Sequence, residues 1–236
     1  MIRSFAATAL IASLSVCEAN AQLAEYTAQY AAEYKGRSVG QSVFSLQFDS
    51  ELEAWVFSST LRARGLLRLI APGPVVDRSE FRLEDTMIVP QLFVHEEGRR
   101  NSEDNYRIEF DWDAGSATVT GEDYTRELPL SEGALDRGSL QVALIHTISE
   151  GEQPGRFSVV DEDSVDEYTY EFEGRESVAT DLGDIEVLRY RQQRPGRTRY
   201  TLIDLAPSLG YVPARIEQIR DGESQSMFLI ESIERP

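Results

Sequence analysis

The 236-residue sequence contains 41% hydrophobic and 27% charged residues, which is typical of a globular protein and excludes a chain that is disordered throughout. Acidic residues outnumber basic residues by 41 to 23, and the formal net charge is -18. A molecule with this charge repels phosphate backbones and anionic lipid surfaces, so we expect no nucleic-acid partner.

Residues 1–21 have the features of a secretory signal peptide. Arg3 supplies a positive charge, residues 5–16 form an apolar stretch, and a small-x-small motif ends at Ala21. The apolar stretch is shorter than the roughly 20 residues that span a membrane. We therefore expect cleavage after Ala21 and a periplasmic location. A lipoprotein with an acylated Cys17 is the alternative, although the residue before that cysteine is a valine, which is a poor fit.

Cleavage would leave residues 22–236, which we predict to form a single β-rich domain. The removed segment carries the only cysteine of the chain. The mature protein would therefore have no disulfide, no thiolate nucleophile and no cysteine ligand for a metal. We also expect no transmembrane segment after cleavage. Because the cleavage removes one charge of each sign, the net charge stays at -18.

Alternation of apolar and polar residues with a period of two predicts β-strands along most of the mature chain. The clearest alternating segments are residues 26–34, 44–48, 55–57, 106–112 and 168–172, and weaker ones are 79–84, 91–99, 116–120, 157–160, 185–192, 198–204, 214–220 and 225–233. Turn residues, many of them glycine, separate these segments. We expect an all-β, mainly antiparallel fold of ten or more strands, curved into an open barrel, a half-barrel or a large sandwich.

Two segments break this pattern. Residues 136–150 have apolar side chains at helical spacing, and Asp136 or Ser139 can cap the start, so we predict one amphipathic helix that packs on the curved sheet or plugs it. Residues 61–76 contain a leucine-rich run followed by Pro-Gly-Pro. This composition indicates a helical turn that leads into a rigid loop.

Catalytic motifs are scarce. The sequence contains two histidines, His95 and His146, and no Gly-x-Ser-x-Gly nucleophile elbow. Two scattered imidazoles do not supply the three or four ligands of a zinc site, and the glycine-rich phosphate-binding motifs are missing. We therefore expect a protein that is not an enzyme and that binds no metal and no cofactor.

The charged residues allow two interpretations each. The acidic run at residues 161–167 suits a calcium ion, but it lacks the spacing and the central glycine of a calcium-binding loop, so we favour a solvated loop. All basic residues except Lys35 are arginines, and they alternate with acids on the predicted outward faces. We expect these arginines to form surface ion pairs rather than a binding patch.

The candidate binding surface is apolar, because a curved sheet with aromatic side chains inside is either filled or leaves a ligand cavity. The candidate residues on strands are Tyr30, Phe44, Trp55, Phe110 and Trp112, and those of the irregular segment, which would form a lip at one end, are Leu66, Leu67, Leu69 and Ile70. The alternative is that all of them are ordinary core, with the aliphatic residues packed under a loop.

The order of several motifs resembles the DUF3108 family of exported bacterial proteins of unknown function. The motifs are the aromatic segment 26–34 with its glycine turn, Arg64-Gly65-Leu66, residues 90–93, 110–112, 135–140 and 181–183, and the distinctive segment from Leu205 to Glu217. The resemblance implies a β-rich protein that faces the cell envelope. It implies no catalytic residues, because the family has none established.

These observations favour a non-enzymatic binding or interaction module of the periplasm, with an apolar cavity for a lipid-like or other hydrophobic ligand. Its partner would be a hydrophobic small molecule or an envelope protein. One alternative is an envelope hydrolase that uses paired carboxylates on glycan or peptide material. Another is an assembly factor that binds its partners through an edge strand.

Overall fold

The computed structural model describes residues 23–69, 72–98 and 103–236. The expected signal peptide and its cleavage site lie outside the described residues, and so does Ile70. The elements are β1 (Tyr26–Tyr34), β2 (Arg37–Asp49), β3 (Ala54–Ala63), the 3-10 turn η1 (Gly65–Leu69), β4 (Val75–Glu84), β5 (Met87–Glu96), β6 (Tyr106–Asp111), β7 (Ser116–Gly121), β8 (Thr125–Pro129), α1 (Arg137–Ser149), β9 (Arg156–Val160), β10 (Val165–Thr180), β11 (Gly183–Gln193), β12 (Tyr200–Leu205), the 3-10 turn η2 (Pro207–Leu209), β13 (Pro213–Arg220) and β14 (Glu223–Glu234).

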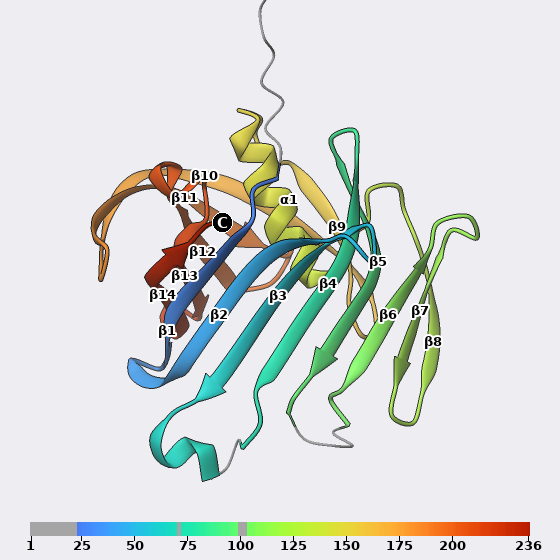
Figure 1. The fold of residues 1–236 in the computed structure, drawn as a ribbon, viewed down its shortest axis with the longest axis horizontal. Coiled ribbons are helices and arrows are strands. Elements are labelled where there is room, and N and C mark those ends of the chain that lie inside the picture. The colour runs from blue at the N-terminus through green and yellow to red at the C-terminus, as the bar shows by residue number, and fades with distance from the viewer. Residues whose placement is uncertain (1–22, 70–71, 99–102) are drawn as a thin grey trace, which may run out of the picture.

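All strands belong to one 14-stranded sheet with the order β8-β7-β6-β5-β4-β3-β2-β1-β14-β13-β12-β11-β10-β9. Every ladder joins strands that are consecutive in the sequence, except the antiparallel pairing of β1 with β14. The sheet is therefore made of two meanders, β1–β8 and β9–β14, joined at β1 and β14. Figure 1 shows it curving around α1 as a nearly closed, barrel-like wall. The predicted all-β antiparallel fold is confirmed.

The strands follow from the alternation in the sequence. In β1, for example, Tyr26, Ala28, Tyr30 and Ala32 are buried, while the residues between them are half-buried. The apolar side of each such strand faces the inside of the curve, where the main hydrophobic cluster lies. The strand β8 was not expected, because its sequence Thr-Arg-Glu-Leu-Pro does not alternate between apolar and polar residues.

The helix α1 lies where the sequence predicts it, and it begins with a capping box. The Asp136 carboxylate accepts hydrogen bonds from the backbone N–H groups of Gly138 and Ser139, and the Ser139 hydroxyl accepts one from the Asp136 backbone N–H. Eight of its 13 residues are buried, so the helix is less one-sided than the expected amphipathic helix. It lies inside the curve of the sheet, where it contacts β3, β4, β5 and β9, as expected for a helix that plugs the sheet (Figure 1).

The two outer ends of the sheet approach each other near the start of α1. Leu135 forms a parallel bridge with Val159 of β9, through backbone hydrogen bonds of 2.9 Å to Ser158 and 2.8 Å from Val160. These bonds occupy part of the β9 edge. In the part of the chain that the structure describes, neither α1 nor any other helix is long and apolar enough to cross a membrane.

Candidate functional site: an arginine-lined cavity and an apolar crevice

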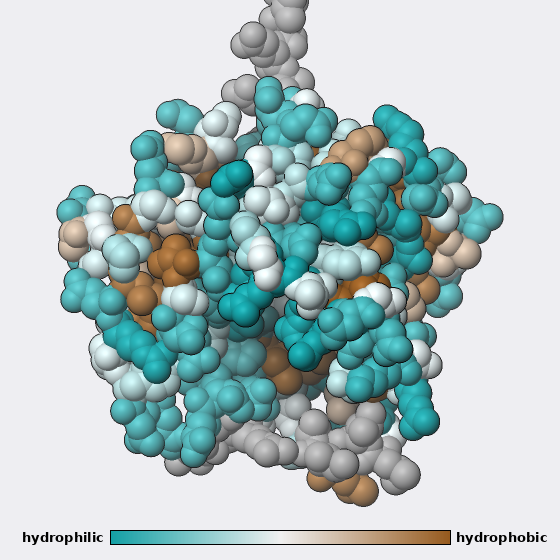
Figure 2. Space-filling model, turned by 180° about the vertical axis from the view of Figure 1, so that it is seen from behind, coloured by the Kyte–Doolittle hydropathy of each residue, from teal (hydrophilic) through white to brown (hydrophobic). Residues whose placement is uncertain are grey.

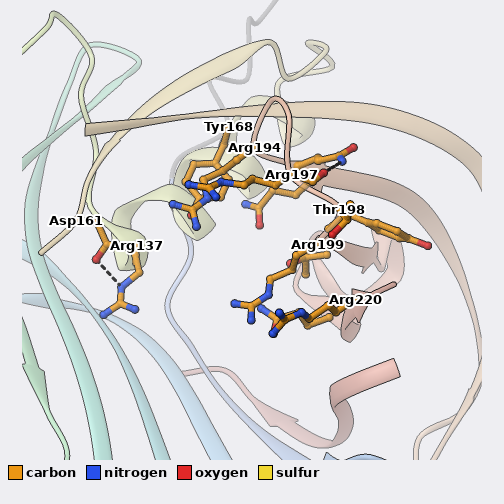
Figure 3. A pocket seen from close by; sticks show the side chains of 13 residues that line it. Arg137, Asp161, Tyr168, Arg194, Arg197, Thr198, Arg199 and Arg220 are labelled. Atoms are coloured by element: carbon orange, nitrogen blue, oxygen red, sulfur yellow. Dashed lines mark hydrogen bonds and ion pairs between the residues drawn. The ribbon is translucent and has the colours of Figure 1, made fainter. Parts of the chain in front are cut away.

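A cavity of about 520 Å³ lies between the start of α1 and the strands β10–β13. Five arginines line it, and we call it the arginine cavity (Figure 3). Its lining consists of Arg137, Asp161, Tyr168, Gln192, Gln193, Arg194, Arg197, Thr198, Arg199, Tyr200, Thr201, Gln218 and Arg220.

Three different elements supply the five arginines. Arg137 is the first residue of α1, and Arg220 is the last residue of β13. The other three belong to the tight connection between β11 and β12, which reverses at Pro195-Gly196 and is closed by a backbone hydrogen bond of 3.2 Å from the N–H of Arg197 to the carbonyl of Arg194.

Arg137 is held by groups from both sides of the barrel. Its Nε lies 3.6 Å from Oδ1 of Asp161, and it also donates a hydrogen bond to the Tyr106 hydroxyl. Oδ1 of Asp77, on β4, lies 4.0 Å from Nη2 of Arg137. Burial lowers the pKa of the Arg137 guanidinium, but the nearby Tyr106, Asp161 and Asp77 outweigh this effect, and the net pKa is raised. The group therefore stays charged in spite of its partial burial.

The remaining arginines differ in how they are paired. Arg194 forms an ion pair with Asp166 and lies 5.9 Å from the centre of the Tyr168 ring. Arg220 lies 3.6 Å from the Asp221 carboxylate at an exposed position. Within the described residues, no ion pair joins Arg197 or Arg199 to a carboxylate.

The lining of the cavity is strongly cationic, although the protein as a whole is acidic. Five arginines against the single carboxylate of Asp161 leave an excess of four positive charges among the lining residues. Counting the ion-pair partners outside the lining, Asp166, Asp221 and Asp77, reduces this excess to one. The whole chain, in contrast, has a net charge of -18. The cavity is thus a local reversal of charge, which is the arrangement that attracts an anion into a cleft.

A second cavity, of about 180 Å³, opens beside the first, and we call it the apolar crevice. It lies between α1 and the strands β12 and β13. Its lining consists of Arg137, Leu140, Gln141, Leu144, Tyr168, Gln192, Thr201, Ile203, Leu205, Pro213 and Ile216. Four of these residues, Arg137, Tyr168, Gln192 and Thr201, also line the arginine cavity. The two spaces therefore adjoin, with Arg137 and Tyr168 at their junction.

The surface agrees with this description. Figure 2 shows the face opposite to that of Figure 1 as mainly hydrophilic, with hydrophobic atoms visible in a hollow near its centre. A polar rim around an apolar floor is the usual composition of a site for a small molecule.

The strand residues that the sequence analysis proposed as ligand-binding lie in packed clusters. Tyr30 and Phe44 are buried with ring centres 4.6 Å apart, and the Tyr30 hydroxyl donates a hydrogen bond of 2.9 Å to the carbonyl of Pro213. Trp55 is half-buried and packs against the same cluster. Phe110 and Trp112 stack with ring centres 6.0 Å apart in a separate cluster, farther along the same meander at β6. None of these five lines a described cavity.

The proposed lip is only partly described. Leu66, Leu67 and Leu69 belong to η1, and the Leu69 side chain is 81% exposed. Ile70 lies outside the described residues. Leu69 does not line the arginine cavity or the apolar crevice, and a role of the lip in binding stays a prediction.

The two histidines occupy different surroundings. His95 lies 2.6 Å from the Asp77 carboxylate, with its ring 5.4 Å from that of Tyr106. His146 is buried on α1 and faces a separate cavity of about 180 Å³ near the start of β1. Across the described residues, no three His, Cys, Asp or Glu side chains form a group that could hold a metal ion.

Two expectations about charged residues need correction. The arginines do form ion pairs, as expected, but five of them also gather on one cavity. The acidic run at 161–167 is not simply solvated, since Asp161 and Asp166 face Arg137 and Arg194, and Glu162 accepts a hydrogen bond of 2.8 Å from the Tyr124 hydroxyl. The signal for the cavity was present in Arg194-Pro195-Gly196-Arg197-Thr198-Arg199, where three arginines flank one turn.

Comparisons with known proteins extend the description of the fold. The family model described as "Protein of unknown function (DUF3108)" matches residues 26–229, which confirms the resemblance noted above. No curated protein matches the sequence.

Several solved structures match this chain but share little sequence with it. A beta-barrel-like protein of the domain of unknown function DUF1849 from Brucella abortus has a TM-score of 0.57 and 12% identity, with 91% of this chain and 99% of that chain covered. MucB has a TM-score of 0.37 and 11% identity, with 93% of this chain and 55% of MucB covered. A protein with a YmcC-like fold from Bacteroides fragilis has a TM-score of 0.35 and 12% identity, with 89% and 95% covered. The first of these likenesses shows the barrel-like fold.

Proposed function

Since this chain belongs to the DUF3108 family, a family of unknown function, we propose its function from its own geometry: it is a non-enzymatic binding module that holds the hydrocarbon part of a lipid-like ligand in the apolar crevice. The signal-peptide pattern of residues 1–21 supports a periplasmic location for this activity.

The observation that carries the proposal is the apolar lining of the crevice. Leu140 and Leu144 of α1 face Ile203 and Leu205 of β12 and Ile216 of β13 across it. Each CH₂ group that leaves water for such surroundings gains about 0.8 kcal/mol. A chain that buries about six of them would gain about 5 kcal/mol, from which the cost of immobilising the ligand is subtracted.

The two alternative functions receive less support. Of the residues that line the arginine cavity, Asp161 is the one acid, and it is already paired with Arg137. A hydrolase with two working carboxylates would need a second acid at this position. An assembly factor would need a free strand edge, but the Leu135 bridge covers part of β9, and β8 carries charged residues and Pro129.

The test fills the crevice and measures the binding of an uncharged ligand. N-phenylnaphthylamine, which is neutral and fluoresces in apolar sites, serves as the probe, and monolauroylglycerol displaces it. We expect Ile216→Phe to weaken the binding of both at least about tenfold, which corresponds to about 1.4 kcal/mol. Gln141→Phe, on the helix side of the crevice, is a second filling variant.

Ile233→Phe is the matched control, because Ile233 is half-buried on β14 and does not line the crevice. Circular dichroism and thermal unfolding show that each variant is folded. The proposal is wrong if the wild-type protein binds neither ligand, or if both filling variants bind as the wild type does.

A further inference from the structure

We infer that the ligand is an anionic amphiphile, a single hydrocarbon chain with a phosphate or carboxylate head group, and that the arginine cavity holds this head group while the apolar crevice holds the chain. The inference rests on the proposed function, because it specifies the ligand of the same site.

The first argument is the orientation of the arginines. Figure 3 shows the side chains of Arg199 and Arg220 lying together, with their guanidinium groups directed toward the side of the cavity where Arg137 and Asp161 lie. A guanidinium presents five N–H donors in a planar fork that matches a carboxylate or a phosphate. Two such groups side by side can donate to one anion together.

The second argument is the surplus of charge. Arg197 and Arg199 form no ion pair with a carboxylate among the described residues, and Asp161 alone represents the acids in the lining. Cations gathered without matching anions repel each other, and a bound anion relieves this repulsion. In a chain with 41 acidic residues, such a surplus is not the expected outcome of an even distribution of charge.

The third argument is that the cavity and the crevice share lining residues. Arg137 and Tyr168 border both spaces, so an anion in the cavity lies next to the entrance of the crevice. One molecule with a charged end and an apolar chain would fill both. The net charge of -18 repels an anionic bilayer as a whole, which favours a single dissolved molecule over a membrane surface.

The experiment compares three ligands that separate the head group from the chain. They are lauroyl lysophosphatidic acid below its micelle concentration, the uncharged monolauroylglycerol with the same chain, and glycerol phosphate without a chain. Calorimetric titration at low salt is expected to show the lysophosphatidic acid binding at least about tenfold more tightly than either of the others. This advantage is expected to shrink as salt is added, because ions screen exposed charges.

The variant Arg199→Gln/Arg220→Gln removes two charges from the rim of the cavity. We expect it to bring the ratio of the two lauroyl affinities close to one. The matched control Arg82→Gln/Arg107→Gln removes the same charge at exposed positions of β4 and β6 that do not line the cavity, and it should leave this ratio unchanged.

The outcomes separate this inference from the proposed function. If monolauroylglycerol binds and the lysophosphatidic acid binds no more tightly, the head-group site is wrong while the crevice stands. Glycerol phosphate binding as tightly as the lysophosphatidic acid would contradict one molecule filling both spaces. Binding only to vesicles that contain phosphatidic acid would overturn the single dissolved ligand. If no lauroyl compound binds, the proposed function itself fails.

Discussion

Asp136 is a carboxylate with no exposed surface at the point where α1 meets the sheet. Its Oδ1 accepts hydrogen bonds from the N–H groups of Gly138 at 2.7 Å and Ser139 at 2.9 Å, and its Oδ2 accepts one of 2.8 Å from the Ser79 hydroxyl. Burial raises the pKa of this carboxyl above 3.8, and the hydrogen bonds from Ser139, Ser79 and Gly138 oppose the rise without cancelling it. The residue thus caps the helix and fastens it to β4.

Asp136→Ala is expected to lower the free energy of unfolding by about 3 kcal/mol, because it removes a helix cap and leaves buried donors without acceptors. Asp136→Asn keeps one acceptor for the helix N–H groups, and we expect a loss of only about 1 kcal/mol at acidic pH. Urea unfolding measures both values. Equal losses for the two variants would contradict the role of the side-chain acceptor.

The raised pKa of Asp136 is tested by the pH dependence of the stability difference between the wild type and Asp136→Asn. Between 3.8 and the higher pKa of the folded state, the folded protein binds more protons at Asp136 than the unfolded chain does. The stabilisation that protonated Asp136 gives is therefore complete below 3.8 and is lost as the pH rises through the folded-state pKa. We expect the wild type to lose stability relative to Asp136→Asn as the pH rises above 3.8 and through the raised pKa of the folded state. A constant difference would mean that the pKa is not raised.

At the scale of elements, α1 approaches the sheet closely at Gly138. A Cβ atom placed on this residue would lie 2.7 Å from Cβ of Ser79 and 3.2 Å from Cδ1 of Phe57. Both neighbours are buried, on β4 and β3, and have little room to move. The glycine therefore sets how deeply the helix sits in the barrel.

Gly138→Ala is expected to destabilise the protein by about 1–3 kcal/mol through overpacking, although alanine is the better helix former by about 1 kcal/mol. Gly155→Ala is the control, since a Cβ there meets no atom within 4 Å; it should be neutral or stabilising by a few tenths of a kcal/mol. Thermal unfolding of both variants gives the comparison. A stabilised Gly138→Ala would show that the helix can shift away from the sheet.

Much of the element structure could be predicted from the sequence, because each strand of the buried wall alternates and the helix carries its own capping residues. The strand β8 could not, since Thr125–Leu128 are largely exposed and contact the core too little to leave a pattern. The extent to which α1 is buried could not be predicted either. It depends on how far the sheet curves around the helix, which no local sequence pattern encodes.

At the scale of the whole molecule, hydrogen bonds from two tyrosines join the ends of the sheet. The Tyr106 hydroxyl of β6 donates a bond of 2.9 Å to Asp161, and the Tyr124 hydroxyl, beside β8, donates one of 2.8 Å to Glu162. Burial and the bond to Glu162 raise the pKa of Tyr124 to about 12, so this phenol remains a donor at neutral pH. The two bonds connect the first meander to the connection between β9 and β10.

Tyr106→Phe/Tyr124→Phe is expected to lower the free energy of unfolding by about 3 kcal/mol, at about 1 kcal/mol for each of three lost hydrogen bonds, since the Tyr106 hydroxyl also accepts one from Arg137. Amide hydrogen exchange should become faster in β8 and β9, where the ends of the sheet meet, and change little in β1 and β14. Tyr34→Phe, at a position that is 52% exposed on β1, is the control. A uniform increase in exchange would contradict a local role in joining the ends.

The candidate site is a property of the whole molecule, which is why little of it could be predicted. Its arginines come from the start of α1, the turn after β11 and the end of β13, and they meet only because the helix lies inside the curved sheet. The apolar crevice forms between α1 and strands that follow it by more than fifty residues in the chain. The alternating aromatic residues predicted the packed core well. They did not indicate the two cavities, because these are lined by residues at the boundary between polar and apolar surfaces.

The ladder between β1 and β14 has a consequence for how the protein acquires its shape. Each other ladder joins neighbours along the chain, so the entropy lost in closing it is small, and both meanders can begin to form early in folding. The seam between β1 and β14 has to wait for residues 223–234, roughly two hundred positions after its partner strand. Until β14 forms, the backbone N–H and C=O groups along one edge of β1 have no partner strand. A chaperone that covers this edge would protect the chain from aggregation.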